Sequence, residues 1–132
     1  MEEARDRAYR ELAAEVVHRA ADDYCRELRK TKLLKLEAFF RSDTFRLYTN
    51  DKIDPELLLG RLMEKRDWNM KMKEQIFQRY GGRGGVERFA EEVGVSPVTV
   101  RTVLKSAIYP DNVERWEEVL LYGGQGQNGT SC

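Results

Sequence analysis

Cysteine and histidine are scarce in this chain, and their scarcity argues against a common kind of metal site. The 132 residues contain two cysteines and one histidine, too few for a conventional four-ligand zinc site. Cys25 lies inside a helical pattern and Cys132 in a polar tail. A disulfide between them would restrain little of the chain, so we expect two free thiols. We expect His18 at a surface or boundary position of a helix, and we predict no metal and no cofactor.

Long apolar runs are also lacking. No stretch approaches the roughly 20 consecutive apolar residues that span a bilayer, and the charged residues 1–10 are not followed by the apolar segment of a signal peptide. We therefore expect a soluble, cytoplasmic protein with no membrane partner.

A surplus of either charge is missing as well. The chain has 23 basic and 23 acidic residues, divided 15 and 15 up to residue 68 and 8 and 8 after it. A neutral chain has no overall field that would draw it to nucleic acid. Any nucleic-acid contact must therefore come from local clusters of basic residues.

Apolar residues at helical spacing are abundant. From Glu2 to Lys30 they recur at every fourth position in two neighbouring rows, which predicts one long amphipathic helix. The two rows are Ala8, Leu12, Val16, Ala20, Tyr24, Leu28 and Tyr9, Ala13, Val17, Ala21, Cys25. A second helix is predicted over residues 32–48, with Ser42-Asp43 as the point where it would be interrupted.

A third helix is predicted to begin at Asp54-Pro55, because Asp caps free helical amides and Pro suits the first helical position. It should run to about Trp68. Asn69–Tyr80 continues at helical spacing, and the sequence leaves open whether it is separate. The glycine run at 81–85 ends it, since consecutive glycines lose too much entropy to stay helical.

The strongest local signal lies in residues 86–105, VERFAEEVGVSPVTVRTVLK. The pattern fits a helix-turn-helix: Ala90 is small where two helices approach closely, and Gly94 stands where the turn needs a positive φ. Ser96 would cap the second helix, and Pro97 would occupy its first turn. The residues expected to point inward are Phe89, Val93, Val95, Val100 and Val103.

The segment GVSPVTVRTVL resembles the recognition-helix segment of phage Cro/repressor-type and LacI-type regulators. Residues 69–122 resemble a Cro/repressor-like domain, with helices at Asn69–Tyr80, Val86–Val93, Pro97–Ser106 and Asn112–Tyr122. The resemblance implies a domain that binds double-stranded DNA. The chain departs from it by lacking the fifth helix that such domains often carry; residues 123–132 are polar and Gly-rich, and we expect them to be disordered.

The N-terminal half, with FFRSDTFRLYT and ELLLGRLMEK, is similar to small phage and prophage proteins without an assigned activity, which implies a mobile-element origin. The expected fold is all-α. It comprises an N-terminal bundle of about three helices over 1–68, a helix-turn-helix domain of about four helices over 69–122, and the tail.

If the second helix of the motif enters the major groove, Arg101 is the best candidate to read a base, because its guanidinium can bond bidentately to guanine. Val98 would pack on a thymine methyl. The other candidate DNA-contacting residues, which would take phosphates, are Ser96, Thr99, Thr102 and Lys105, with Arg83 and Arg88 as flanking contacts.

A second basic cluster lies around the first two predicted helices. It contains Arg26, Arg29, Lys30, Lys32, Lys35, Arg41 and Arg46. Phe39, Phe40 and Phe45 are interleaved with it, and basic residues with aromatics can bind single strands by stacking. The alternative interpretation is a solvated face above phenylalanines at core-like spacing.

The leading hypothesis is therefore a transcriptional regulator of phage or prophage type, in which the N-terminal helices form a homodimer or sense a partner. The alternative is a phage accessory or anti-defence protein, anti-CRISPR-like, that binds a host protein and represses its own promoter. An enzyme is not predicted, because the adjacent pairs Asp22-Asp23 and Glu91-Glu92 point to different helix faces and no Ser or Cys has a base supplied by its spacing.

Overall fold

The computed structural model describes residues 2–122, and every regular element in that range is a helix. The helices are α1 Glu2–Arg26, α2 Lys30–Phe40, α3 Asp43–Tyr48, α4 Pro55–Tyr80, α5 Gly85–Val93, α6 Pro97–Val103 and α7 Val113–Glu117, which continues as a π-helical turn, η1, over Glu118–Tyr122. The all-α prediction is confirmed. The expectation for the tail at 123–132 concerns residues outside this range.

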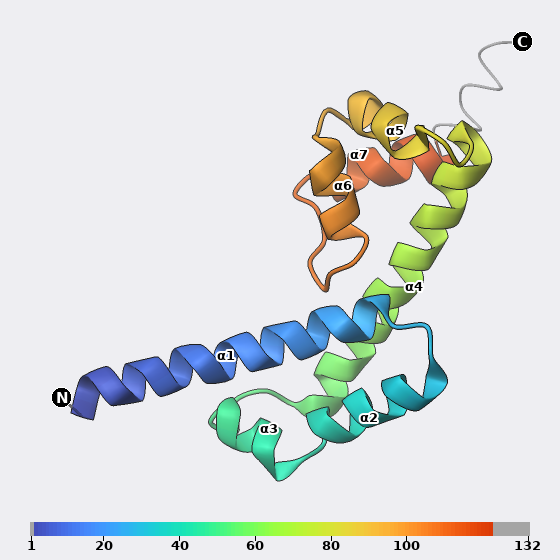
Figure 1. The fold of residues 1–132 in the computed structure, drawn as a ribbon. Helices are drawn as coiled ribbons and strands as arrows, with labels where there is room; N and C mark the ends of the chain where they lie inside the picture. Colours follow the sequence, from blue (N-terminus) through green and yellow to red (C-terminus); the bar gives the residue numbers. More distant parts are fainter. Residues whose placement is uncertain (1, 123–132) are drawn as a thin grey trace, which may run out of the picture.

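Helix α4 is the element that both halves of the molecule share. It rises from the group formed by α1, α2 and α3 to the group formed by α5, α6 and α7 (Figure 1). The sequence left open whether the helix that reaches Trp68 breaks before Asn69, and α4 continues through both residues without a break. No glycine or proline interrupts the helix there, and the buried Asn69 amide finds its partners in other elements. The division into domains at 68/69 stays a prediction, with its boundary inside this helix.

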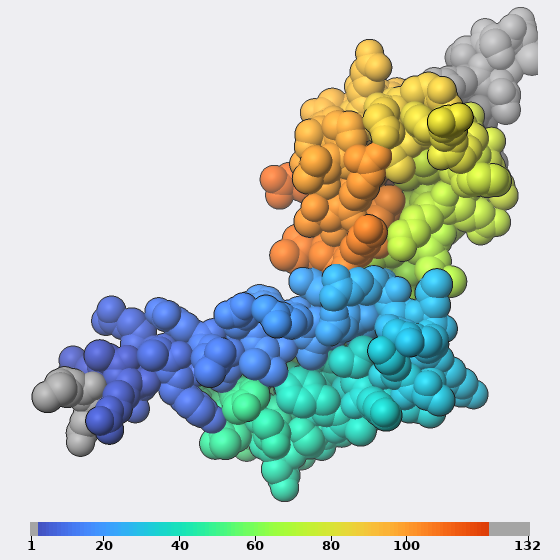
Figure 2. Space-filling view, viewed as in Figure 1, coloured from blue at the N-terminus to red at the C-terminus, as the bar shows by residue number. Residues whose placement is uncertain are grey.

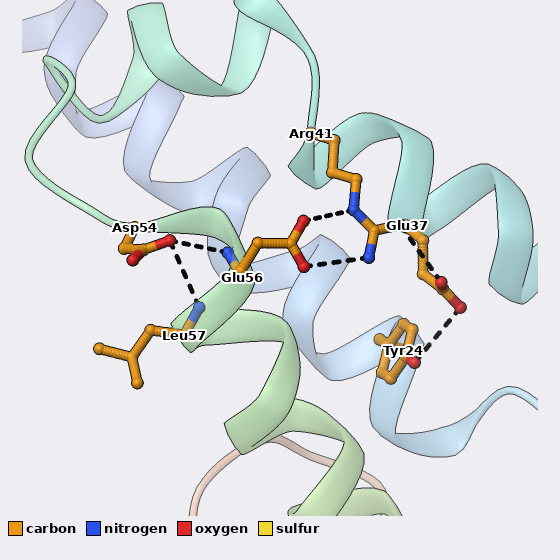
Figure 3. Close-up of polar contacts among 6 residues, drawn as sticks. All are labelled: Tyr24, Glu37, Arg41, Asp54, Glu56 and Leu57. Carbon is orange, nitrogen blue, oxygen red and sulfur yellow. Dashed lines mark hydrogen bonds and ion pairs between the residues drawn. The ribbon is translucent and has the colours of Figure 1, made fainter.

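The first turn of α4 is held by polar contacts that the sequence pattern indicated in part (Figure 3). The Asp54 carboxylate accepts hydrogen bonds from the backbone amides of Glu56 at 2.9 Å and Leu57 at 3.5 Å, as a helix cap does. Glu56 in turn accepts from the Arg41 guanidinium at 2.6 and 3.2 Å, which ties α4 to the end of α2. Arg41 also pairs with Glu37, which accepts from the Tyr24 hydroxyl of α1.

The predicted helix over 32–48 is two helices, and the interruption lies where the sequence placed it. Ser42 ends α2 and caps α3: its hydroxyl donates to the Phe39 carbonyl at 2.6 Å and accepts from the Phe45 amide at 3.2 Å. The bend between the helices brings Phe40 and Phe45 together edge to face, both fully buried. Because the chain bends at Ser42, apolar residues of α2 and α3 pack against each other in one core.

Both apolar rows of α1 are more exposed in the N-terminal part of the helix than their spacing suggested. Ala20 and Tyr24 of the first row and Ala21 and Cys25 of the second are buried, whereas Leu12 is 61% exposed. Leu28, which lies beyond the end of α1, is also exposed. The cause is the length of α1, whose N-terminal part extends past the other helices (Figures 1 and 2).

The C-terminal core forms around Trp116, which is fully buried and packs edge to face with the Phe89 ring. The predicted inward side chains Phe89, Val93, Val100 and Val103 are buried in this core, and Val95 packs against it partly buried. Ala90 is fully buried, as expected for the close approach of two helices. Between α5 and α6, Gly94 takes φ +81° and ψ 32°.

We predict that Gly94→Ala lowers the free energy of unfolding by about 1–2 kcal/mol, because an L-residue at this φ strains the backbone. A Cβ there would meet nothing within 4 Å, so the cost is conformational and not steric. Gly60→Ala is the matched control: a Cβ at Gly60, inside α4, also meets nothing, and alanine there should raise stability by about 0.5–1 kcal/mol. Denaturant unfolding measures both variants. Equal effects of the two changes would contradict the positive-φ argument.

Candidate nucleic-acid interface

The outer face of α6 carries the side chains that the sequence singled out. Val100, Val103 and the following Leu104 are buried, so the helix is fixed by its apolar side. The remaining candidates are exposed, and Val98 most clearly, at 69%. The exposed side chains are Ser96, Val98, Thr99, Arg101, Thr102 and Lys105. They form one short surface that follows directly from the burial of the opposite face.

Two of these polar side chains already have a structural role at the start of α6. The Ser96 hydroxyl accepts a hydrogen bond from the Thr99 amide at 3.1 Å and lies 2.9 Å from the Thr99 hydroxyl. The predicted cap by Ser96 is therefore confirmed. Its hydroxyl and that of Thr99 satisfy each other, so each retains only part of its hydrogen-bonding capacity for an external group.

Arg101, the candidate base-reading residue, is held by an ion pair. Its guanidinium lies 2.5 Å from a carboxylate oxygen of Glu87 on α5, with both side chains about half exposed. The hydrogen bond from Arg101 is the main cause that lowers the pKa of Glu87 below its usual range. The pair depends on how α5 packs against α6, which no helical spacing predicts. An exposed pair of this kind contributes little to stability and is readily exchanged.

The two predicted flanking residues lie in the loop that precedes α5 and at its start. The Arg88 guanidinium donates to the backbone carbonyls of Tyr80 and, at 3.3 Å, of Arg83. It thus binds the free carbonyl at the end of α4 and holds the glycine loop closed. Arg83 is exposed on that loop. The arrangement gives Arg88 a structural role that the sequence did not indicate and leaves Arg83 open to solvent.

The second basic cluster does not present aromatic rings for stacking. Phe40 and Phe45 are fully buried and Phe39 is half-buried against them, so the hypothesis of base stacking on these rings is wrong. The rings are taken up by the N-terminal core. Several of the basic side chains have acidic partners: Arg26 pairs with Asp23, Arg29 with Glu27, and Arg41 with Glu37 and Glu56. Those left facing solvent are Lys30, Lys32, Lys35 and Arg46.

The sequence pattern did not predict that Lys65, behind α6, is a buried cation. Lys65 of α4 is 1% exposed, and its ammonium donates to the Asn69 side-chain oxygen at 2.6 Å. It also donates to the backbone carbonyls of Val103 at 2.8 Å and Ser106 at 2.9 Å. Val103 is the last residue of α6, where the aligned peptide dipoles favour a positive charge, and Ser106 lies in the segment that follows. Lys65 therefore fixes the C-terminal end of the candidate surface to α4.

The surroundings of Lys65 are apolar and aromatic. Its ammonium lies 5.1 Å from the ring centre of Trp68 and 5.3 Å from that of Tyr109, within the range of cation–π attraction. Burial lowers the pKa of Lys65 to about 8. Burial likewise raises the pKa of the Cys25 thiol to about 11. At neutral pH the lysine is thus still charged and the cysteine is a neutral free thiol.

Helix α1 also takes part in the polar contacts around Lys65 and Asn69. The Asn69 amide donates to the carbonyls of Cys25 at 3.3 Å and Ser106 at 3.2 Å. Asp22 of α1 accepts a hydrogen bond from the Ala107 amide at 2.8 Å. Three distant parts of the chain, namely the end of α1, the middle of α4 and the segment after α6, are therefore linked by one network. The sequence signal that marks it is a Lys and an Asn on the apolar side of α4.

Other kinds of site find no support over residues 2–122. No three His, Cys, Asp or Glu side chains in this range are grouped so that they could hold a metal ion. None of its helices combines the length and the apolar character needed to cross a membrane. His18 is exposed on α1.

Comparison of the chain with protein-family models, with curated proteins and with solved structures found no match in any of the three.

We predict that the stability of the protein rises with pH between about 8 and 10.5 because of Lys65. In the folded state Lys65 releases its proton near pH 8, whereas the unfolded chain holds it to about 10.5. The unfolded state then binds more protons, so the free energy of unfolding increases by up to about 1.4 kcal/mol per pH unit. Denaturant unfolding at pH 7, 8 and 9 should show this rise in the wild type and not in Lys65→Met.

The unfolding measurements stop at pH 9 because of Cys25. Its raised pKa lowers the free energy of unfolding as the pH rises from about 9 to 11, opposite to the effect of Lys65. Lys71→Met, which removes an exposed lysine of the same helix, serves as the control. Parallel wild-type and Lys65→Met curves from pH 8 to 9 would contradict the assignment.

Proposed function

We propose that this protein binds double-stranded DNA sequence-specifically through α6, as a transcriptional regulator of phage or prophage type. The observation that carries the proposal is the position of α6. It follows α5 after a tight turn at Gly94, buries one side in the C-terminal core, and exposes Val98, Arg101 and Lys105 on the other. These features support a helix-turn-helix, in which the second helix would enter the major groove.

The chemistry of the exposed face fits base readout by few residues. Arg101 offers the guanidinium that pairs bidentately with guanine, and Val98 an apolar surface for a thymine methyl. Thr102 and Lys105 are placed to take phosphates, with Ser96 and Thr99 contributing what their mutual hydrogen bond leaves free. On DNA, Arg101 exchanges the carboxylate of Glu87 for a base edge.

Charge on the same half of the molecule limits how strongly DNA binds. The net charge of the chain is zero, and Glu91 and Glu114 are exposed near α6 in the sequence. Because non-specific affinity comes from neutralised phosphates, such a protein binds random DNA weakly. Discrimination between sequences then depends on the few base contacts rather than on general attraction, and a homodimer on two half-sites would double those contacts.

A second candidate function has its own observation. The N-terminal part of α1 extends beyond the other helices and exposes Tyr9, Leu12 and Val16. Apolar side chains exposed together on one helix face are typical of a surface that binds another protein. They favour the alternative of an accessory or anti-defence protein, anti-CRISPR-like, that binds a host protein. Two further expectations remain predictions: the protein is not an enzyme, and it acts in the cytoplasm.

The proposal predicts that selection from a random duplex library at physiological salt enriches one site, and that Arg101→Ala weakens binding to it. Loss of a bidentate contact to guanine should cost about 1–3 kcal/mol and relax the preference at one position. Arg115→Ala is the matched control, because Arg115 is an exposed arginine of α7 that is also ion-paired. Enrichment of no site at all would overturn the proposal and favour the protein-binding alternative.

We also predict that Glu87→Gln strengthens binding to the selected site about two- to fivefold. The change removes the competitor for Arg101, and an exposed ion pair contributes up to about 1 kcal/mol. Glu91→Gln, an equal change of charge at an exposed position of α5, is the control. Titrations of labelled duplex with both variants measure the effect. If both strengthen binding equally, the gain is one of general charge and Arg101 is not restrained by Glu87.

A further inference from the structure

A groove that the DNA-binding surface does not use lies where α1, the connection from α3 to α4, α4 and the segment after α6 meet. It has a volume of about 730 Å³, within the range of small-molecule sites. Its walls are mainly apolar: Val17, Ala21, Ile53, Leu58, Leu62 and Ile108. Four separate parts of the chain thus line one mainly apolar groove.

The polar groups in this groove are few and differ in sign. Arg61 supplies a guanidinium, His18 an imidazole and Glu64 one carboxylate. Within residues 2–122 Arg61 makes no ion pair, so its forked guanidinium is available for a carboxylate. Glu64 likewise makes no ion pair in this range; it raises the pKa of Tyr109, as a smaller cause than burial. The groove therefore offers nitrogen donors from two helices, His18 of α1 and Arg61 of α4, against one carboxylate, and Arg61 is the group suited to a bidentate contact.

The wall formed by residues 107–109 connects the groove to α6. The Ala107 amide donates to Asp22, and the carbonyl of the preceding Ser106 accepts from Lys65 and Asn69. Val103, the last residue of α6, accepts from the same ammonium. A ligand that packs against Ala107 and Ile108 thus contacts backbone next to Ser106. The Ser106 carbonyl shares the Lys65 ammonium with the carbonyl of Val103, at the end of α6.

We propose that this groove binds a small apolar carboxylate, its hydrocarbon part against Val17, Leu58 and Ile108 and its carboxylate on Arg61, and that occupancy restrains the end of α6. The second part rests on the proposed function, because it makes the ligand an effector of DNA binding. The first part stands independently of DNA.

Three probes with one hydrocarbon chain and different head groups test the ligand class: octanoate, 1-octanol and octylamine. Titration of the full chain, followed by chemical shifts of the amides of residues 106–109, should show saturable binding in which octanoate is the tightest by at least about fivefold. Tighter binding of octylamine would place the ligand charge at Glu64 and overturn the carboxylate assignment. Equal binding of all three would remove any role of Arg61.

Two pairs of variants locate the site. Arg61→Gln should weaken octanoate at least about fivefold and leave 1-octanol within about twofold. Ala14→Phe, at an exposed position of α1 that lines the groove, should abolish binding of both. Ala38→Phe, at an exposed alanine of α2 outside the groove, is its control. Binding that survives Ala14→Phe, or an absence of saturable binding to the wild type, would overturn the proposal.

Hydrogen exchange in the absence of DNA tests the link to α6. Octanoate should slow exchange of the amides of residues 103–108 in the wild type and not in Ala14→Phe. Unchanged exchange with a filled groove would refute the restraint while leaving the binding site intact. Failure to select a DNA site would refute the effector role alone, so the two proposals can be told apart.

Discussion

The ammonium of Lys65 is the group on which the arrangement of the rest of the molecule depends. Moving a charge out of water costs several kcal/mol unless polar partners replace the water. Here the replacement is the Asn69 oxygen and two backbone carbonyls, that of Val103 at the end of α6 and that of Ser106 just after it. These acceptors are in place only when α6 lies at one position along α4. The cost of burying the charge therefore selects one packing of α6 over its alternatives.

The same constraint explains how one helix serves two cores. Leu59 and Leu62 of α4 belong to the N-terminal core, and Met72 and Ile76 to the C-terminal one. Lys65 and Asn69 lie between these two apolar stretches, and the polar layer that they form is satisfied, since no buried side-chain nitrogen or oxygen among residues 2–122 lacks a partner. A polar layer of this kind gives a continuous helix a defined register against each neighbour.

The functional proposal follows from what this packing leaves exposed. With its apolar side committed to Trp116 and its end tied to Lys65, α6 can present only one face to solvent. The pair between Arg101 and Glu87 then links that face to α5. The groove beside Ala107 belongs to the same arrangement, because the segment that forms its wall is anchored by Asp22. The exposed face of α6 and the groove are thus both positioned by the buried contacts of Lys65 and Asp22.

Local spacing was enough to predict the helices, the turn at Gly94 and the caps by Ser96 and Asp54, because each depends on residues within a few positions of one another. It left open whether the helix continues through Asn69, because a polar residue there is explained only by its distant partners. The pairing of Arg101 and the burial of Lys65 were likewise decided by tertiary structure. Both depend on atoms many residues apart, and only the packing of helices determines which distant charge or carbonyl a side chain meets.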